Sequence, residues 1–550
     1  MEQLAHPELP LHPQPANVRT PLNEYQQRNL SFMRKCETEQ RVGGMILDQM
    51  GAGKTLTVLA YLATYGGRTL VVCPANVLRT WEAEIQKHIA PAILSYQFYY
   101  ERDRHTSDYS GAQLVLTTYA TLTQDHDGEQ FTGFLHTTCF DRIVLDEAHH
   151  IRTLSSKQHT AVCSLMGEHR WCMTGTAIWN NLSDMYALFK FLRYYPLADA
   201  DYFRHNVQGE AGCRLLFRHF LPLAICHRRR EVDAIVRRAF VVSVPMAQVD
   251  REIYDKCRRL FRLKIEHLLL MYNKLSEGRI RARMQFCTIA LITLLRQLAS
   301  SAELLNRPAI GDVDRGCSVC WDANVSTALS PCSHRFCCQC LSHFKDLQRC
   351  PLCGQLVYER KDSLQDEPVH VFRIRAAPSA KTLTVLDLVL RQHPAEKIVV
   401  FSLWLHYIDI IEHWLARNGV QCLRIEGKIT PTQRQERCSL FNTSPKYRVM
   451  LCSLTAGSEG SNLNAASVSI VCEPHWTEAR VEQAQMRIDR YDQAGKQSLT
   501  CYTLISENTI EDQVNRMASQ KKDMALAVMT QTAPPKDWVN RIKLMMNEIF

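Results

Sequence analysis

Short apolar runs alternate with stretches of helical spacing in two regions of the chain, residues 22–200 and 379–515. Apolar runs that end in small or polar residues are typical of parallel strands covered by helices on both faces. The runs that predict such strands lie at 43–47, 69–73, 114–117 and 142–145 in the first region and at 397–401, 448–453 and 467–472 in the second. The pattern therefore predicts an α/β fold with two parallel-sheet lobes.

The pattern changes between these two regions and at both ends of the chain. Residues 201–310 contain long charged amphipathic stretches, which predict protruding helices with basic faces or, alternatively, ordinary solvated helix surfaces. Residues 1–21 are rich in proline and histidine and are expected to be a disordered lead. Residues 516–550 are expected to form a helical tail.

Composition and charge favour an intracellular, soluble protein that binds a polyanion. The 550 residues allow three or four domains, and lysine plus arginine exceed aspartate plus glutamate by 65 − 56 = 9. No apolar run approaches the ~20 residues that span a bilayer, so no membrane partner is expected. Eight of the 22 cysteines lie within 317–353, which indicates a metal site in a reducing compartment and not a disulfide framework.

The first candidate site is a glycine-containing loop between an apolar strand and a helical stretch. Gly51 and Gly53 lack a Cβ, so the backbone can turn tightly and bring its N–H groups against phosphate oxygens. Lys54 can reach the outer phosphates of a nucleotide, and the Thr55 hydroxyl can bind Mg²⁺. Because a strict phosphate loop has glycine where Asp48 stands, a plain turn before a helix is the alternative.

The second candidate site is a pair of carboxylates, Asp146 and Glu147, directly after the strand predicted at 142–145. One carboxylate can hold the shell of Mg²⁺, and the other can orient and deprotonate an attacking water. An acidic pair in the first turn of a helix is the alternative. Downstream of a Gly-Lys-Thr loop in the same α/β unit, the catalytic interpretation is favoured.

Eight cysteine and histidine residues in 317–354 have the spacing of zinc ligands. Eight soft ligands suffice for two tetrahedral zinc ions. A segment this short cannot build a sufficient core, so zinc binding of order 10 kcal/mol per site would supply its folding energy. The alternative for the one histidine is an ordinary loop residue. The candidate ligands are Cys317, Cys320, Cys332, His334, Cys337, Cys340, Cys350 and Cys353.

Taken together, these motifs resemble the Swi/Snf-type DNA-dependent ATPases of helicase superfamily two, and the zinc segment resembles a RING finger. Gln26 is similar to the family's adenine-recognising glutamine, and the loop around Lys54 is similar to its first motif, which has an acidic residue at Asp48. The positions that resemble its nucleotide-binding residues are Gln26, Asp48, Gln49, Met50, Gly51, Ala52, Gly53, Lys54, Thr55 and Gly460, and those that resemble its catalytic residues are Lys54, Asp146, Glu147, Arg487 and Arg490.

The resemblance implies two RecA-like lobes that close over one ATP with Mg²⁺. Arg487 and Arg490, from the second lobe, would then reach the γ-phosphate only in the closed form; surface salt bridges are the alternative for both. A RING finger between the lobes is the arrangement of the helicase-like transcription factors and of post-replication-repair ATPases. With so short a lead, the chain most resembles the compact global transactivators of baculoviruses.

The resemblance also implies a function. We expect an ATP-dependent translocase on double-stranded DNA that remodels protein–DNA complexes or chromatin in transcription, in the nucleus, or in the host nucleus if the protein is viral. Chromatin or transcription proteins, and a ubiquitin-conjugating enzyme docked on the RING, are the expected protein partners. The alternative is a RING ubiquitin ligase or recruitment scaffold whose ATPase lobes mainly dock on DNA.

Overall fold

The structure is a computed structural model of the chain. It describes residues 2–39, 42–49, 51–100, 104–125, 133–175, 183–207, 209–227, 236–259, 292–305, 377–427, 429–454, 463–488 and 498–519, together with the backbone of 327–329 and 335–337. Among the predicted site residues, Met50, Gly460, Arg490 and the side chains of all eight zinc ligands lie outside these ranges. Within the ranges, no helix has the length and apolar character needed to cross a membrane.

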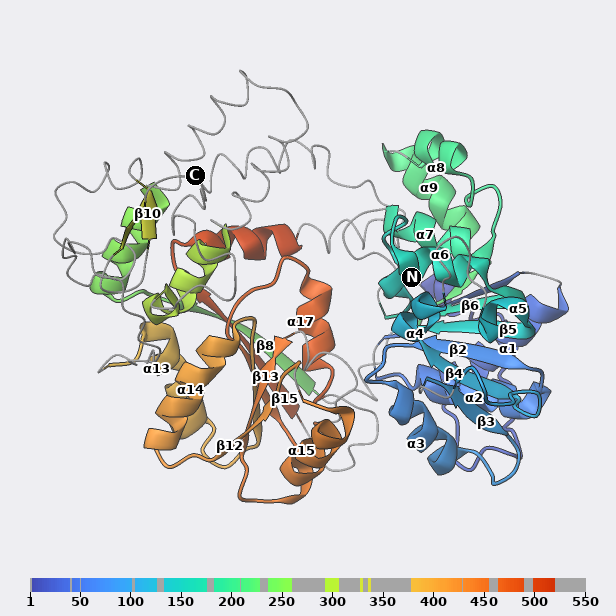
Figure 1. The fold of residues 1–550 in the computed structure, drawn as a ribbon, viewed down its shortest axis with the longest axis horizontal. Coiled ribbons are helices and arrows are strands. Elements are labelled where there is room, and N and C mark those ends of the chain that lie inside the picture. Colours follow the sequence, from blue (N-terminus) through green and yellow to red (C-terminus); the bar gives the residue numbers. More distant parts are fainter. Residues whose placement is uncertain are drawn as a thin grey trace.

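The first lobe is a parallel sheet with helices on both faces (Figure 1). Its strands lie in the order β3-β4-β2-β5-β6-β1-β7. They are β1 (Gly43–Ile46), β2 (Thr69–Cys73), β3 (Tyr96–Tyr99), β4 (Leu114–Thr118), β5 (Cys139–Asp146), β6 (Met166–Met173) and β7 (Ala224–Ile225). Strands β1, β2 and β4 are buried throughout, which is why they read as unbroken apolar runs. Because all pairs are parallel, β1 and β5 end at the same edge of the sheet.

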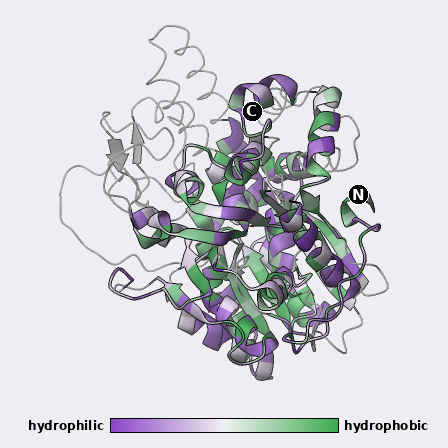
Figure 2. Cartoon of the chain, turned by 90° about the vertical axis from the view of Figure 1, so that its right-hand side faces the viewer, coloured by the Kyte–Doolittle hydropathy of each residue, from purple (hydrophilic) through white to green (hydrophobic). Residues whose placement is uncertain are grey.

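Two hydrophobic cores flank this sheet, one on each face. Helices α1, α2 and α3 pack on one face, and α4, α6, α7 and α9 pack on the other. In Figure 2, hydrophobic segments lie mainly along the central strands and hydrophilic segments toward the outside. The helices are α1 (Glu24–Thr38), α2 (Lys54–Tyr65), α3 (Leu78–His88), α4 (Tyr119–Gln124), α5 (Phe134–Thr137), α6 (Lys157–Ser164), α7 (Ser183–Leu192), α8 (Ala200–Asn206) and α9 (Gly209–Phe220), with 3-10 helices η1 (Glu2–Ala5) and η2 (Ala148–Ile151).

The second lobe repeats this architecture with strands in the order β12-β13-β11-β14-β15-β8. Helices α13 and α14 contribute to one of its two cores, and α15 and α17 to the other. The strands are β8 (Val236–Val244), β11 (Ile398–Ser402), β12 (Cys422–Ile425), β13 (Val449–Ser453), β14 (Val468–Val471) and β15 (Ser498–Ser506). The helices are η3 (Ala302–Leu305), α13 (Ala380–Asp387), η4 (Leu388–Gln392), α14 (Leu405–Arg417), α15 (Pro431–Thr443) and α17 (Glu478–Gln485), with further helical residues at 248–259, 292–300 and 510–519. The α/β fold with two parallel-sheet lobes is thus confirmed.

The boundary between the lobes differs from the one that the sequence predicts. Strand β7 closes the edge of the first sheet, so the first lobe continues beyond residue 200. Strand β8 pairs along its whole length with β15, so residues 236–244 belong to the second sheet and not to a helical protrusion. The chain therefore passes from one sheet to the other between Ile225 and Val236. Within the predicted RING segment, β9 (Thr327–Leu329) and β10 (Arg335–Cys337) form an antiparallel pair.

The N-terminal segment is not the disordered lead that its composition predicts. Leu4 is fully buried in one core of the first lobe, and Leu9 and Val18 join the other. The backbone N–H of Cys226 donates to the carbonyl of Leu4 at 2.9 Å, next to β7. A few apolar side chains and backbone hydrogen bonds therefore hold residues 2–21 on the lobe, although proline and polar residues dominate their sequence.

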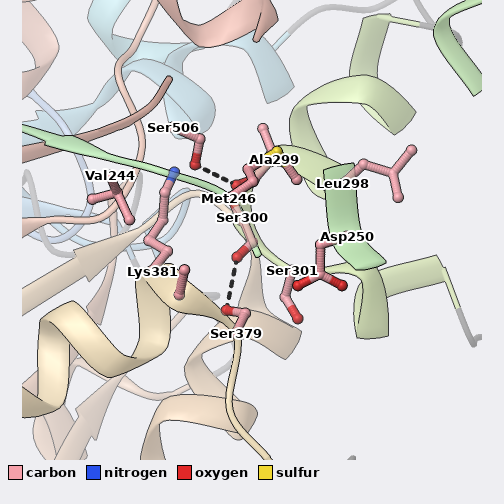
Figure 3. A pocket seen from close by; sticks show the side chains of 11 residues that line it. Val244, Met246, Asp250, Leu298, Ala299, Ser300, Ser301, Ser379, Lys381 and Ser506 are labelled. Carbon is pink, nitrogen blue, oxygen red and sulfur yellow. Dashed lines mark hydrogen bonds between the residues drawn. The ribbon is translucent and has the colours of Figure 1, made fainter. Parts of the chain in front are cut away.

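A buried polar network lies where helix 292–300, α13 and the end of β15 meet (Figure 3). The hydroxyl of Ser379 donates to the carbonyl of Ser300 at 3.2 Å, and the hydroxyl of Ser506 donates to the carbonyl of Ala299 at 2.6 Å. The cavity between them measures about 10 Å³, which is room for one water molecule. This place therefore fastens the elements of the second lobe together and is too small for a nucleotide.

Glu473, two residues after β14, belongs to the same network. Its carboxylate accepts hydrogen bonds from the hydroxyls of Ser402 (3.0 Å) and Ser300 (3.2 Å) and from the N–H of Leu403 (2.9 Å). Burial raises the pKa of Glu473 to about 7, although the charge of Lys381 opposes the shift. Since the folded protein keeps a proton that the unfolded chain releases near pH 4.5, this group makes the free energy of unfolding fall as the pH rises from about 4.5 to 7.

Glu473→Gln is expected to remove this fall, because the amide stays uncharged at every pH. The gain over the unsubstituted chain should be small at pH 5 and grow toward pH 8, with an upper limit of about 3 kcal/mol for a shift of this size. Melting temperatures of both chains across this pH range measure the difference. Two curves that run parallel would contradict the role assigned to Glu473.

Candidate nucleotide site

Loop 47–53 joins β1 to α2 at the carboxyl edge of the first sheet. Gly51 and Gly53 have φ angles of 81° and 78°, in the left-handed region that side chains with a Cβ rarely adopt. A Cβ at Gly53 would also lie only 2.4 Å from Nε2 of Gln26. No side-chain hydrogen bond caps α2 at Gly53, so the first N–H groups of the helix suit an anion.

One side chain from α1 and one from the start of α2 contact the backbone of this loop. Nε2 of Gln26, in α1, donates to the carbonyl of Ala52 at 3.2 Å. Nζ of Lys54 donates to the carbonyls of Asp48 (2.8 Å) and Gln49 (3.3 Å). The amine of Lys54 is therefore held inside the loop that the sequence predicts to bind phosphate.

Asp146 ends β5 and is buried next to this loop. Its carboxylate accepts a hydrogen bond from Nε1 of Trp81 at 2.9 Å and another from the N–H of Glu147 at 3.0 Å. Burial and the adjacent charge of Glu147 raise the pKa of Asp146 to about 6, against the hydrogen bond from Trp81 and the charge of Lys54. The ionised form of this buried carboxylate is therefore unfavourable, and a cation bound beside it would stabilise that form.

Glu147 has the opposite electrostatic setting. Burial acts to raise its pKa, but the contact with His149, whose Nδ1 lies 3.4 Å from its carboxylate, and the charges of Lys54 and Arg487 lower it to about 2. Glu147 is therefore ionised at neutral pH, as a group that accepts a proton must be. Its backbone has a φ of 51°, a strained conformation for a residue other than glycine and one that is concentrated at functional sites.

The second lobe reaches the same site through the end of α17, which lies on the side of that lobe facing the first (Figure 1). Nε2 of Gln49 lies 4.0 Å from Sδ of Met486. The next residue, Arg487, is half-buried, and its positive charge contributes to the low pKa of Glu147. Residues that are more than 300 positions apart in the sequence thus meet at the glycine loop.

The donor set fits a nucleoside triphosphate with Mg²⁺. The loop offers N–H groups and an amine to phosphate oxygens, while the buried carboxylate of Asp146 offers the hard oxygen ligand that Mg²⁺ prefers. The structure gathers these predicted residues in one place: Gln26, Asp48, Gln49, Gly51, Ala52, Gly53, Lys54, Thr55, Asp146, Glu147 and Arg487. The predictions for Met50, Gly460, Arg490 and the eight zinc ligands lie outside the described residues.

Three side chains of this site had no role assigned to them from the sequence, although Trp81 stands at a position that resembles one of the family's motifs. Trp81 donates to Asp146, and the amide of Asn29 donates to the carboxylate of Asp48. His227, 179 residues later in the sequence, contacts the same carboxylate. The three-residue spacing between Gln26 and Asn29 on one helix face is a signal that could have indicated Asn29, whereas no local pattern marks His227.

Comparisons with known proteins agree with this geometry. Residues 25–304 match the SNF2-related domain, residues 313–360 match the C3HC4-type zinc finger (RING finger), and residues 380–492 match the helicase conserved C-terminal domain. The order of the three matches is that of the first lobe, the zinc segment and the second lobe. The RING finger match implies zinc binding in the segment where the cysteines cluster.

Individual relatives match most of the chain at moderate identity. The chain is 25% identical over 591 residues to DNA repair protein RAD5B of Arabidopsis thaliana, covering 90% of the chain and 46% of the relative. It is 27% identical over 541 residues to the helicase-like transcription factor of Homo sapiens, covering 88% and 52%. It is 27% identical over 525 residues to the probable global transactivator of Orgyia pseudotsugata multicapsid polyhedrosis virus, covering 93% and 92%. The chain thus spans about half the length of the first two relatives.

Proposed function

The chain belongs to the SNF2-related family, and from that premise we propose that it is a DNA-dependent ATPase that moves along double-stranded DNA and remodels the protein–DNA complexes it meets. Transcription and DNA repair are the settings that the names of its relatives suggest. The nucleus, or the host nucleus for a viral protein, is the corresponding compartment.

The observation that supports this proposal most is the meeting of both lobes at one glycine loop. Lys54 and Glu147 lie on the first lobe, and the charge of Arg487, from the second, acts on Glu147. An ATPase that couples hydrolysis to movement needs such a divided site, because closure of the lobes then completes the catalytic set. A static nucleotide-binding fold has no need of it.

Each residue of the site has its own proposed role in ATP hydrolysis. Lys54 and the loop N–H groups would bind and orient the phosphates, and Asp146 with the Thr55 hydroxyl would hold Mg²⁺. When bound, Mg²⁺ neutralises charge that develops on the phosphate oxygens. Glu147, ionised at neutral pH, orients the attacking water and accepts its proton. Arg487 stabilises the charge of the transition state from the other lobe.

Lys54→Ala is expected to weaken ATP binding by about 10- to 100-fold, because a hydrogen bond to a charged group is worth ~1.5–3 kcal/mol. A fluorescent ATP analogue titrated into the chain with Mg²⁺ measures the affinity. Lys87→Ala removes an exposed lysine from α3 and serves as the control, with no change expected. Equal affinity in the Lys54 variant and in this control would remove the loop from the nucleotide site.

The RING finger is proposed to hold two zinc ions and to dock a partner, with a ubiquitin-conjugating enzyme as the partner class. The alternative function, a ubiquitin ligase or scaffold whose lobes only dock on DNA, is supported by the same zinc segment. ATP turnover measured with and without duplex DNA separates the two. Strong stimulation by DNA supports the motor, and turnover that ignores DNA supports the scaffold.

A further inference from the structure

The carboxylate of Asp48, at the start of the glycine loop, is 1% exposed and is held from two directions. The amide of Asn29, in α1, donates to Oδ2. On the other side, the backbone N–H of His227 donates to Oδ1 at 2.8 Å, and Nδ1 of the same residue lies 3.0 Å from that oxygen. The carbonyl of Asp48 in turn accepts a hydrogen bond from Nζ of Lys54. His227 is thus linked to the amine of Lys54 through a single intermediate residue, Asp48.

Both ring nitrogens of His227 face groups that only accept hydrogen bonds. Nδ1 faces the carboxylate of Asp48, and Nε2 lies 3.2 Å from the carbonyl of Ala5. A neutral imidazole has one N–H, so it satisfies one of these acceptors, whereas an imidazolium satisfies both. The geometry is therefore that of a ring that bridges the buried carboxylate of Asp48 and the N-terminal segment. The ring of Tyr25 also packs against His227, with the two ring centroids 5.9 Å apart.

His227 also lies next to the connection between the two lobes. His227 lies two residues after β7, and its carbonyl accepts a hydrogen bond from the N–H of Gln49 at 3.4 Å, so its backbone still contacts the chain that leaves β1. By Val236 the chain has entered the sheet of the second lobe. His227 is therefore the last described residue of the first lobe before the connection between the lobes.

We propose that His227 is a positioning residue that holds Asp48, and through it loop 47–53, in the form that receives phosphate. The inference rests on the proposed ATPase function. A loop fixed before binding loses little conformational freedom when the nucleotide arrives. The same contacts fasten the loop to the N-terminal segment and to the connection between the lobes, so a change in either is felt at Lys54.

His227→Gln is expected to raise the dissociation constant and the KM for ATP by about tenfold, because the ring that bridges Asp48 and the carbonyl of Ala5 is lost. The value of kcat should stay within about threefold, since His227 does not touch the reacting groups. A fluorescent ATP analogue measures binding without turnover, DNA-stimulated phosphate release gives KM and kcat, and melting without nucleotide reports folding.

Two further variants separate positioning from packing. His6→Gln changes a buried histidine of the N-terminal segment, whose ring faces the carbonyls of Leu221 and Ala224. It should lower the melting temperature and leave the dissociation constant within about twofold. His227→Arg supplies several donors that can meet both acceptors and should restore the affinity to within about threefold of the unsubstituted chain.

The results have distinct meanings. The inference is overturned if His227→Gln binds the analogue as well as the unsubstituted chain, if His6→Gln weakens binding as much, or if His227→Arg binds no better than His227→Gln. Failure of the unsubstituted chain to bind the analogue at all would instead refute the proposed ATPase function. A raised KM with preserved kcat, seen only at His227 and relieved by arginine, supports the proposal.

Discussion

Arg487→Ala is expected to slow DNA-stimulated ATP turnover by about 10³-fold or more, with a much smaller change in ATP affinity. Arg487 comes from the second lobe, and its charge already acts on Glu147 in the structure. A guanidinium brought across the gap between two lobes stabilises charge that grows on the phosphate oxygens in the transition state, so its loss acts on kcat more than on KM. Steady-state kinetics with saturating duplex DNA measures both parameters.

The matched control for this variant is Arg391→Ala. Arg391 lies on the same lobe, and its side chain is 84% exposed in a pair with Asp387, so its replacement removes the same charge without touching the site. Such an exposed pair contributes ~0–1 kcal/mol at most, and turnover should not change. If turnover of the Arg487 variant stays within tenfold of this control, Arg487 of the second lobe has no role in the catalytic step, and the first lobe alone carries out hydrolysis.

Glu147→Gln is expected to reduce turnover by about 10²- to 10⁴-fold while ATP binding is kept. Glutamine has nearly the same shape but cannot accept a proton from water, and the low pKa of Glu147 shows that the native group is ionised at neutral pH. Because the adjacent Asp146 is unchanged, the proposed metal ligand remains. Single-turnover phosphate release, together with titration of a fluorescent ATP analogue, separates the chemical step from binding.

Glu168→Gln provides the comparison for this second variant. Glu168 lies in β6 of the same lobe, and its side chain is exposed. The same change of charge there should alter neither binding nor turnover. Loss of ATP binding in the Glu147 variant would assign that residue to holding the nucleotide, and unchanged turnover would remove it from the catalytic set.

The strands of both lobes could be predicted wherever they are buried on both faces. The run Leu70–Val72 of β2 and the run Ile398–Phe401 of β11 lie in the middle of their sheets, so burial alone requires them to be apolar. Strand β6 was not predicted, because its first half is partly exposed and carries Glu168 and His169 among apolar residues. Strand β7 is only two residues long, too short for any periodicity.

The sequence also did not show to which lobe strand β8 belongs. Strand β8 precedes the zinc segment in the sequence but pairs with β15, more than 250 residues later, and most of its side chains are exposed. A pairing over that distance leaves no local trace, since it depends on how the whole second lobe closes. For residues 2–21 the composition predicts disorder, but the structure places them on the first lobe. A few buried side chains such as Leu4 are enough to hold them there.

By itself, the sequence determined the chemistry of the candidate site: a lysine after two loop glycines, a carboxylate pair after a buried strand, and arginines in a motif of the second lobe. These are local patterns, because each depends on which side chains a strand end or a helix start can present. Only the tertiary structure decided which groups support them, namely Trp81 beside Asp146 and His227 beside Asp48. Hydrogen bonds across the packed sheet depend on distances in space, and the order of residues along the chain does not encode those distances locally.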